Sequence, residues 1–386
     1  MQTNQNIKPK KHYGQNFLKD SIIIDKILQA SSELFKSTKA SLESKAQKPL
    51  ESKIAQPLQS AQKSSEKTPL DFDTHSSKDS STNALDKKAQ NLALVEIGVG
   101  LGDLSIQLLS FAPLIAYEID ETLCSFVLQR FKSENLANDF DLRQVDVLSL
   151  PFAIDAQKSK KPPKNKQGNT KQHSRYTKPK QNPKSSLPSF WLASTPYVLI
   201  SNLPYYIATR IILTALKDPL CLGFVVMTQK EVADKFCATS GDGKFCALSV
   251  LAQSAGEIKW LFDVPKEAFN PMPKVTSSVF SLHKIDKKSQ ISNENNASQA
   301  SNENQASQVQ NLCGTLDFKL DSNEFENLLK IAFSSPRKKL FSNLATHYDK
   351  NELEKIFATL NLPLKARAHE LCTQDYHHIF TKLHKT

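Results

Sequence analysis

The sequence predicts an α/β protein with a doubly wound, Rossmann-like parallel sheet and a small C-terminal helical domain. Three observations lead to this prediction. Short apolar segments alternate with segments of helical periodicity between residues 91 and 285, as in proteins built from β-α-β units. A glycine-rich turn, Gly98-Val-Gly-Leu-Gly102, follows the first of these apolar segments. Beyond Ser322 the apolar periodicity is helical throughout.

The expected elements follow in chain order. Asp20 or Ser21 can cap a first helix, whose apolar positions lie between residues 22 and 34. Five parallel strands are expected at the short apolar segments 92–97, 114–117, 142–145, 197–201 and 222–228. Helices are expected between them, over 103–109, up to about 132, over 207–216 and over 230–236. An antiparallel pair, 258–264 and 277–282, completes the sheet, and four C-terminal helices are expected at 325–333, 338–345, 352–360 and 367–383.

Composition and charge exclude several classes of protein. The chain has 386 residues and a formal net charge of +11. Its longest apolar runs, such as residues 220–227, are too short to cross a bilayer, which excludes a membrane-spanning protein. Residues 1–11 are polar and basic and lack the apolar core of a secretory signal, so we expect a cytoplasmic protein. The six cysteines form no C-x-x-C pair and the nine histidines show no ligand spacing, so we expect no metal site.

Three segments differ in composition from the rest of the chain: residues 36–90, 156–188 and 286–311. They lack the apolar residues that would offset the entropy cost of ordering, so we expect disordered or loosely ordered insertions. The second segment holds nine lysines, Arg175 and no acidic residue, and therefore carries +10 of the net charge. Such a segment can be a solubilising loop or an RNA contact, and the sequence favours neither.

These insertions define the expected domain organisation. Residues 1–35 form the first segment of the main α/β domain, and residues 36–90 interrupt it. The main domain continues over 91–285 and contains the basic insertion 156–188. A polar linker over 286–311 leads to a C-terminal helical domain over 312–386.

The glycine-rich turn and two acidic residues indicate a nucleoside-binding site. The turn, Glu96-x-Gly98-x-Gly100-x-Gly102, lacks the spacing of a dinucleotide fingerprint and the Lys of a phosphate-binding loop. Glu118 ends the second strand, where a carboxylate can accept hydrogen bonds from a ribose diol. Asp146 ends the third strand, where its carboxylate can accept from an adenine amino group. Ligands of doubly wound sheets bind at these carboxyl ends of strands.

The tetrapeptide Asn202-Leu-Pro-Tyr205 after the fourth strand suits methylation of an exocyclic amine. An adenine amino nitrogen is a poor nucleophile because its lone pair is delocalised into the ring. The Asn202 side-chain oxygen and the Leu203 or Pro204 backbone carbonyl can bind its two N–H groups, which would aim the lone pair at a sulfonium methyl group. Tyr205 can stack on a base flipped out of its helix.

With these motifs the chain resembles the ribosomal RNA adenine dimethyltransferase family. The resemblance covers nearly all of the sequence outside the three insertions. It lies in Tyr13-Gly-Gln-Asn-Phe-Leu18, Val95-Glu-Ile-Gly98, Glu118-Ile-Asp120, Asp146, Asn202-Leu-Pro-Tyr205, Gln229-Lys-Glu-Val-Ala233, Leu248-Ser-Val250 with Gln253, Phe269-Asn-Pro-Met-Pro-Lys-Val275 and Arg367-Ala-His-Glu-Leu371.

The resemblance implies an S-adenosylmethionine-dependent methyltransferase fold and a specific set of site residues. Those expected to contact S-adenosylmethionine are Asn16, Leu18, Gly98, Gly100, Glu118, Asp146 and Asn202. The catalytic residues are expected to be Asn202, Pro204, Tyr205 and Phe269, with Phe269 forming the second wall of the adenine slot opposite Tyr205.

The resemblance also implies the substrate. We expect a monomer that dimethylates two adjacent adenosines in the 3′-terminal hairpin of small-subunit rRNA, within the 30S particle or its precursor, and whose C-terminal domain binds rRNA. The sequence departs from the family pattern at Val99, where Pro is usual, and at Arg337-Lys-Lys339, where a denser run of Arg is usual. Lys is less suited than Arg to bidentate phosphate contact.

Three other functions remain as alternatives. A sister group of the family methylates an adenine of large-subunit rRNA, but Gly14 and Leu203 favour the small-subunit enzyme. A non-catalytic assembly factor on the same fold is disfavoured by the intact Asn202, Pro204 and Tyr205. A DNA adenine methyltransferase is disfavoured by the Phe269 motif and the helical C-terminal domain.

Overall fold

A computed structural model describes residues 7–10, 13–47, 92–150, 191–284 and 323–384. The predicted insertions 156–188 and 286–311 lie outside these ranges, as do residues 48–90 of the first insertion.

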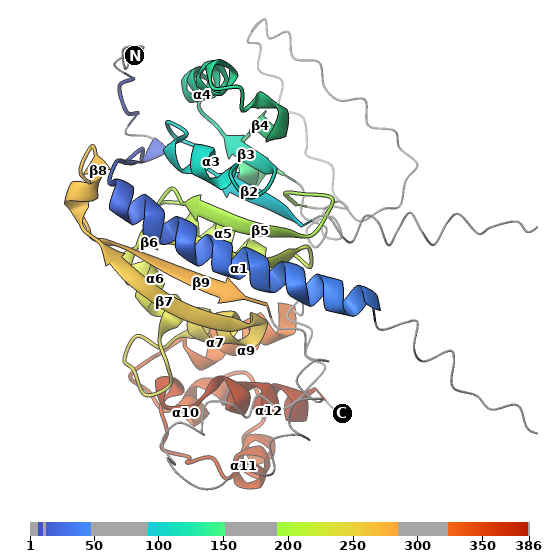
Figure 1. Cartoon of the computed structure of the whole chain (residues 1–386). Helices are drawn as coiled ribbons and strands as arrows, with labels where there is room; N and C mark the ends of the chain where they lie inside the picture. Colours follow the sequence, from blue (N-terminus) through green and yellow to red (C-terminus); the bar gives the residue numbers. More distant parts are fainter. Residues whose placement is uncertain (1–6, 11–12, 48–91, 151–190, 285–322, 385–386) are drawn as a thin grey trace, which may run out of the picture.

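The main domain is built on a mixed sheet of seven strands in the order β4-β3-β2-β5-β6-β9-β7 (Figure 1). The first five in this order are parallel, and β9 pairs antiparallel with both β6 and β7. The strands are β2 (Ala93–Ile97), β3 (Leu114–Glu118), β4 (Phe140–Gln144), β5 (Tyr197–Asn202), β6 (Cys221–Gln229), β7 (Glu257–Val264) and β9 (Ser277–His283). The predicted α/β class, the parallel core and the antiparallel pair are confirmed.

Helices cover both faces of this sheet and divide the core into two clusters. In β5 the side chain of Leu199 lies in one cluster and those of Val198 and Ile200 lie in the other, so the strand is apolar on both faces. One face carries α1 (Ser21–Gln47), α3 (Asp103–Leu108) and α4 (Glu121–Ser133), and the other carries α5 (Ala208–Lys217), α6 (Lys230–Cys237) and α7 (Ala247–Ala255). Of these, α7 was not predicted from the sequence.

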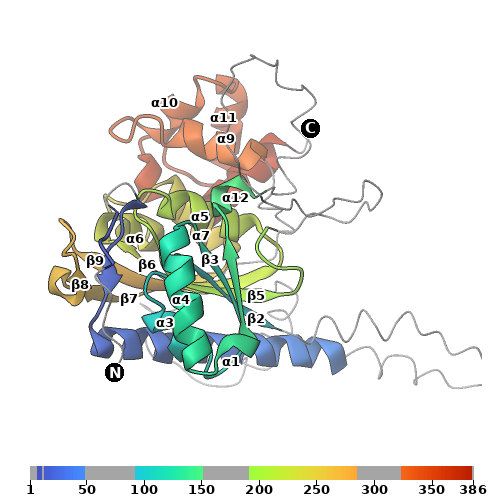
Figure 2. The same ribbon diagram turned by 90° about the horizontal axis from the view of Figure 1, so that it is seen from above.

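The C-terminal helices lie on the side of the sheet opposite α1, as the view from above shows (Figure 2). They are α9 (Asn323–Ala332), α10 (Leu340–Leu344), α11 (Lys350–Thr359) and α12 (Thr373–Leu383). Their apolar side chains join the same core cluster as α5 and α7. Polar contacts reinforce this packing, because Ser254 on α7 hydrogen-bonds His377 on α12 at 2.7 Å and Lys217 forms an ion pair with Glu326.

The first helix is longer than predicted. The sequence placed the start of an insertion at residue 36, but α1 continues to Gln47. Thr38 is buried and Leu42 packs against the core cluster of this face, so with Leu34 they continue one stripe at a spacing of four residues. The Lys-, Ser- and Ala-rich composition concealed this stripe, although Ala, Lys and Glu are good helix formers.

The last predicted helix, 367–383, is two elements instead of one. A short 3-10 turn spans Ala368–Glu370, and α12 begins only at Thr373. Between them Leu371 is extended, with φ −85° and ψ 146°. The Asp375 carboxylate accepts a hydrogen bond from the Cys372 backbone N–H at 2.9 Å, which fixes the new helix start.

A second, two-stranded sheet lies at the edge where the parallel strands end. It pairs β1 (Phe17–Leu18) antiparallel with β8 (Phe269–Asn270). The residues before β1 cross the carboxyl ends of the parallel strands and form part of the wall of the cleft described below. No helix within the described ranges is long and apolar enough to span a membrane.

Candidate active site

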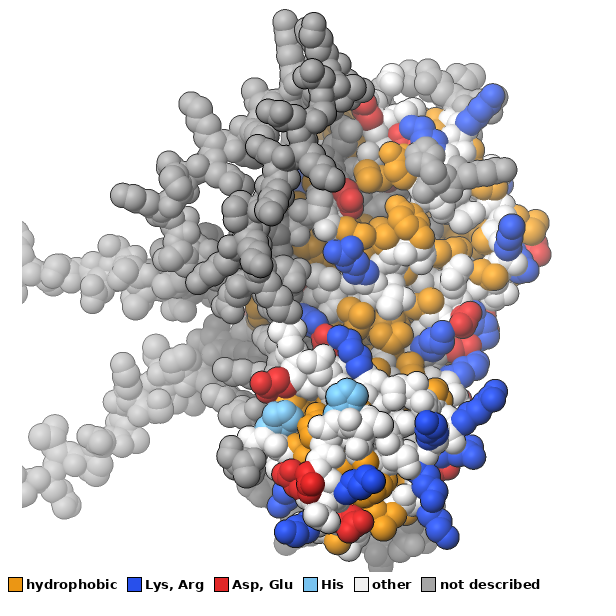
Figure 3. Space-filling model, turned by 180° about the vertical axis from the view of Figure 1, so that it is seen from behind, with side chains coloured by type: hydrophobic (Ala, Val, Ile, Leu, Met, Phe, Trp, Pro, Cys, Tyr) orange, Lys and Arg blue, Asp and Glu red, His pale blue; other side chains and the backbone are white. Residues whose placement is uncertain are grey.

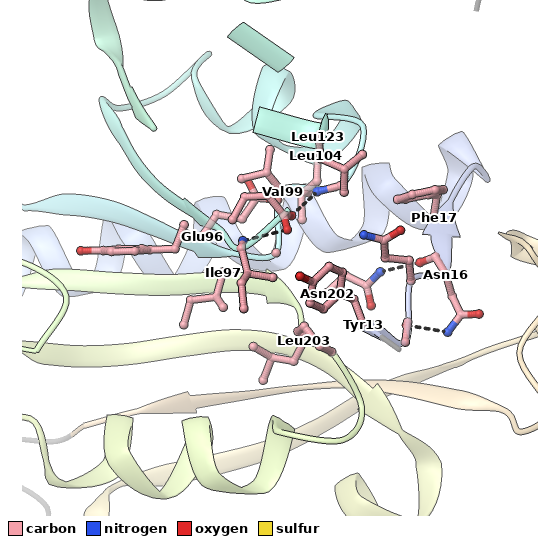
Figure 4. Close-up of a pocket in the computed structure, with 18 of the residues that line it drawn as sticks. Tyr13, Asn16, Phe17, Glu96, Ile97, Val99, Leu104, Leu123, Asn202 and Leu203 are labelled. Carbon is pink, nitrogen blue, oxygen red and sulfur yellow. Dashed lines mark hydrogen bonds between the residues drawn. The ribbon is translucent and has the colours of Figure 1, made fainter. Parts of the chain in front are cut away.

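A cleft opens at the carboxyl ends of β2, β3 and β5 (Figure 4). Its empty space, counted out into open solvent, is about 1030 Å³. Nine of the ten predicted site residues line it: Asn16, Leu18, Gly98, Gly100, Glu118, Asp146, Asn202, Pro204 and Tyr205. Residues from five separate segments of the chain are therefore brought together in one place.

The glycine-rich turn requires glycine for two physical reasons. Its three glycines have positive φ angles of 79°, 58° and 84°, a region that side-chain-bearing residues rarely adopt. Space is also limited, because a Cβ at Gly102 would lie 2.9 Å from Cε1 of Phe131, and one at Gly100 would lie 3.2 Å from Cδ1 of Phe17. The turn is thus packed against both α4 and residues 13–18, and Gly98 and Gly100 line the cleft.

Glu118, the last residue of β3, is held rigidly at the cleft wall. Its side chain is 6% exposed. One carboxylate oxygen accepts hydrogen bonds from the backbone N–H groups of Ile119 and Asp120, both at 2.9 Å, and the other accepts from Gly100 at 3.3 Å. Burial raises the pKa of Glu118 and outweighs these hydrogen bonds, which act in the opposite direction. Since a carboxylate has about four acceptor positions, further donors can be bound.

Glu96 is a buried acid of the cleft for which the sequence analysis proposed no role. It lies on β2 and is 1% exposed. The hydroxyl of Ser105 on α3 donates to it at 2.5 Å. Burial raises the pKa of Glu96 to about 8, and the nearby Glu118 and Asp103 add to this shift. The signal in the sequence was an acidic residue inside an otherwise apolar strand.

Asp146 lies where the sequence placed it, just beyond β4. Its carboxylate accepts a hydrogen bond from the Leu148 backbone N–H at 2.9 Å and so caps the 3-10 turn Val147–Ser149. The predicted strand was 142–145, whereas β4 spans Phe140–Gln144. β4 is an edge strand whose second residue, Asp141, is exposed, so no continuous apolar run marks its first two positions.

Asn202 ends β5 with its side chain directed into the cleft (Figure 4). Its Nδ2 donates to the backbone carbonyl of Asn16 at 3.4 Å. The preceding Ser201 donates to the Ile97 carbonyl at 2.5 Å and joins the ends of β5 and β2. With the amino group of its amide engaged by the N-terminal segment, Asn202 presents its Oδ1 as the hydrogen-bond acceptor for a ligand.

The Tyr205 ring is fixed from the side of β9. Its hydroxyl shares a 2.5 Å hydrogen bond with Oγ of Ser277. Burial raises the pKa of this hydroxyl despite the opposing hydrogen bond, so it stays neutral. The Pro204 carbonyl already accepts a hydrogen bond from the Ile207 N–H at 3.1 Å, which closes the turn into α5.

Phe269 is the one predicted site residue that does not line the cleft. It lies in β8, opposite Leu18 of β1, and is 4% exposed. Its side chain belongs to the core cluster on the α1 face. The expectation that Phe269 forms the second wall of an adenine slot thus remains a prediction.

Comparison with known proteins gives one consistent family. The model for ribosomal RNA adenine dimethylase matches residues 79–297, more than half of the chain. A ribosomal RNA small subunit methyltransferase A of Helicobacter hepaticus is 42% identical over 291 residues, covering 75% of this chain and 81% of the relative. One of Campylobacter hominis is 37% identical, covering 78% and 91%. A crystal structure of a dimethyladenosine transferase from Plasmodium falciparum has a TM-score of 0.48 at 21% identity, covering 77% and 92%.

Proposed function

The chain belongs to the ribosomal RNA adenine dimethylase family, and on that basis we propose the reaction that it catalyses. It transfers methyl groups from S-adenosylmethionine to the N6 amines of two adjacent adenosines in the 3′-terminal hairpin of small-subunit rRNA, giving N6,N6-dimethyladenosine. One observation carries this proposal. The Asn202 amide is fixed by the Asn16 carbonyl inside a cleft that Glu118 and the glycine-rich turn also line.

The cleft fits S-adenosylmethionine by the chemistry of its donor and acceptor groups. Glu118 offers buried carboxylate oxygens for the ribose hydroxyls, and Gly98 and Gly100, which line the cleft without side chains, allow a close approach. In this proposal Asp146, which lines the cleft, accepts from the adenine amino group, and Leu18 forms part of the apolar wall. When bound, S-adenosylmethionine supplies an electrophilic methyl group on a positively charged sulfur.

The residues around Asn202 prepare the substrate amine for methylation. Asn202 Oδ1 and the Leu203 carbonyl accept its two N–H groups and so turn its lone pair toward the methyl group. We favour Leu203 over Pro204 because the Pro204 carbonyl already accepts from Ile207. Tyr205, fixed by Ser277, stacks on the flipped adenine. No strong base is required, since the cationic product loses its proton readily.

A cluster of cations on the C-terminal domain is suited to contact the rRNA backbone. An antiparallel bridge between Lys339 and Arg367 brings two basic segments side by side. All five side chains are exposed, and none forms an ion pair with a carboxylate in the described part of the chain: Arg337, Lys338, Lys339, Lys365 and Arg367. Figure 3 shows Lys and Arg side chains along the edge of this domain. Such unpaired cations bind phosphates and release counterions.

We propose that the enzyme binds its substrate as a 30S particle or its precursor, which places the reaction in the cytoplasm. We also propose that it acts as a monomer.

Transfer of labelled methyl groups from S-adenosylmethionine tests the function. Small subunits that lack the modification should become labelled, and nucleoside analysis should find N6,N6-dimethyladenosine. Large subunits and DNA should stay unlabelled. Labelling of large subunits alone, or of no substrate by a folded protein, would overturn the proposal.

A further inference from the structure

The N-terminal strap, defined as residues 7–10 and 13–18, forms one wall of the cleft. Six consecutive strap residues, 13–18, line it. The strap has little regular structure apart from the two residues of β1, so side-chain contacts must hold it in place. These contacts converge on one residue.

They converge on Asp120, two residues beyond the cofactor-site acid Glu118. The Asp120 side chain is 2% exposed. One of its oxygens accepts from Lys10 Nζ at 2.6 Å and the other from Gln15 Nε2 at 2.9 Å. Gln15 is itself oriented by the Lys10 backbone N–H, which donates to Gln15 Oε1 at 2.7 Å. Burial raises the pKa of Asp120, but the hydrogen bonds together outweigh it and hold the pKa below its usual value.

The strap also contacts Asn202, at the end of the cleft where we propose that the methyl group is transferred. Asn16 follows Gln15 directly, and its carbonyl accepts the hydrogen bond from Asn202 Nδ2 at 3.4 Å. The next two residues pair with β8, and Lys19 N–H donates to the Ala268 carbonyl at 2.8 Å. The Asn16 carbonyl is thus held from one side by Asp120 and from the other by β8.

We propose that Asp120 is a positioning residue for methyl transfer, which rests on the function proposed above. Its carboxylate fixes the strap, the strap fixes the amide plane of Asn202, and the same strap closes the wall against which S-adenosylmethionine binds. Asp120 itself touches neither the amine nor the methyl group.

The chemistry of the contacts requires a carboxylate at this position. Both partners, Lys10 and Gln15, present donors, and a carboxylate is the side chain that only accepts. An Asn in the place of Asp120 would direct an NH2 group at one of these donors. It would still cap α4, because Asn accepts from the Thr122 N–H as well as Asp does, here at 3.0 Å. Asp120→Asn therefore breaks the Gln15 contact and removes the charge that holds Lys10, without removing the helix cap.

The first experiment compares Asp120→Asn with the wild-type chain. Calorimetry should show S-adenosylmethionine binding weaker by roughly tenfold or more, the loss expected for a broken charge-assisted hydrogen bond. The kcat at saturating S-adenosylmethionine should fall as well, because the Asn202 amide loses its support. The affinity for small subunits should stay unchanged, and circular dichroism should show a folded variant. Glu257→Gln is the matched control, since Glu257 pairs with Lys259 on β7 at 2.7 Å and lies outside the cleft.

A second variant and a second readout keep the proposal testable if Asp120→Asn folds poorly. Gln15→Ala should reproduce part of the loss in S-adenosylmethionine affinity. In the double variant, the loss of binding free energy should be smaller than the sum of the two single losses, because both substitutions remove the same contact. Amide hydrogen exchange at residues 15–18 should speed up in either variant, whether or not the protein methylates rRNA. Wild-type binding, kcat and exchange in Asp120→Asn would overturn the inference. Inactivity of the wild-type chain on small subunits would instead overturn the proposed function.

Discussion

Asn202, which we propose as a catalytic residue, depends on contacts that its own motif does not contain. The sequence motif supplied the residue and its place at the end of a strand. The orientation of its amide comes from a carbonyl 186 residues away in the chain, in the strap. A single sequence holds no signal for such a pairing, so the site could be predicted as a set of residues but not as a geometry. The same holds for Tyr205, whose partner Ser277 lies on the antiparallel strand β9.

Replacing Asn202 by Ala should remove methyl transfer and leave RNA affinity nearly unchanged, because the lost Oδ1 acceptor contacts the reacting amine and not the rRNA backbone. We expect a loss of at least about 100-fold in kcat, the effect of one well-placed transition-state contact. Single-turnover assays on small subunits measure it. The control is Asn138→Ala, an exposed residue before the start of β4. Turnover close to wild type in folded Asn202→Ala would contradict the mechanism.

Glu96 should make stability depend on pH. Its folded-state pKa of about 8 lies above the ordinary 4.5, so folding binds a proton. The contribution of protonated Glu96 to the stability of the fold is fully present below about pH 4.5 and is lost as pH rises to about 8. Glu96→Gln keeps an acceptor for Ser105 and removes the titration. In urea denaturation at several pH values, the free energy of unfolding of the variant should rise relative to that of the wild type by a few kcal/mol between pH 5 and 9. Parallel profiles would show that Glu96 does not titrate in this range.

At the scale of elements, the sequence predicted what periodicity can reveal. The parallel strands and their helices were found because an apolar run or a 3.6-residue stripe is a local signal. The pairing of β1 with β8 was missed because each strand has only two residues and the pairing is set by tertiary contacts. The extension of α1 was missed because polar composition was given more weight than the stripe formed by Leu34, Thr38 and Leu42. Leu34 packs over the sheet, where a Cβ on Gly223 would lie 3.4 Å from its Cδ1.

A proline substitution at Thr38 tests whether α1 continues beyond residue 36. Thr38 is 2% exposed and its hydroxyl donates to the Leu34 carbonyl at 2.7 Å, as is typical of a helix interior. Thr38→Pro should therefore lower the free energy of unfolding by about 3 kcal/mol or more. Thr38→Ala, which preserves the helix, should cost about 1 kcal/mol or less. Equal stability of the two variants in urea denaturation would mean that the insertion does begin near residue 36.

At the scale of the whole molecule, the catalytic and C-terminal parts share one apolar cluster and are joined by the Ser254–His377 and Lys217–Glu326 contacts. The cluster of cations on the C-terminal domain is therefore carried by a body packed firmly against the sheet that holds the cleft. The net charge of the chain, however, lies almost wholly in residues 156–188, outside the described ranges. Composition could locate that charge but could not say whether it contacts RNA.

Deleting residues 158–184 and rejoining the ends with a short Gly-Ser linker tests the basic segment 156–188 separately from the cluster of cations on the C-terminal domain. If the ten cations of residues 156–188 contact phosphates, affinity for small subunits should fall less steeply with salt in the deleted protein. The S-adenosylmethionine affinity should be unchanged. Combined substitution of Arg337, Lys338 and Lys339 by Ala is the comparison, and we expect it to lower the salt slope in the intact chain. Superimposable slopes for full-length and deleted proteins would show that the segment only solubilises.

The pairing of β1 with β8 also sets an order of events while the protein is being synthesised. Leu18 emerges from the ribosome some 250 residues before its partner Phe269. At about 5–20 residues per second, the strap waits on the order of 12–50 s for the strand that completes its support. Asn202 and the glycine-rich turn are both made within that interval. A nascent chain interrupted before Phe269 would thus carry the tetrapeptide Asn202-Leu-Pro-Tyr205 but no finished wall of the cleft beside it.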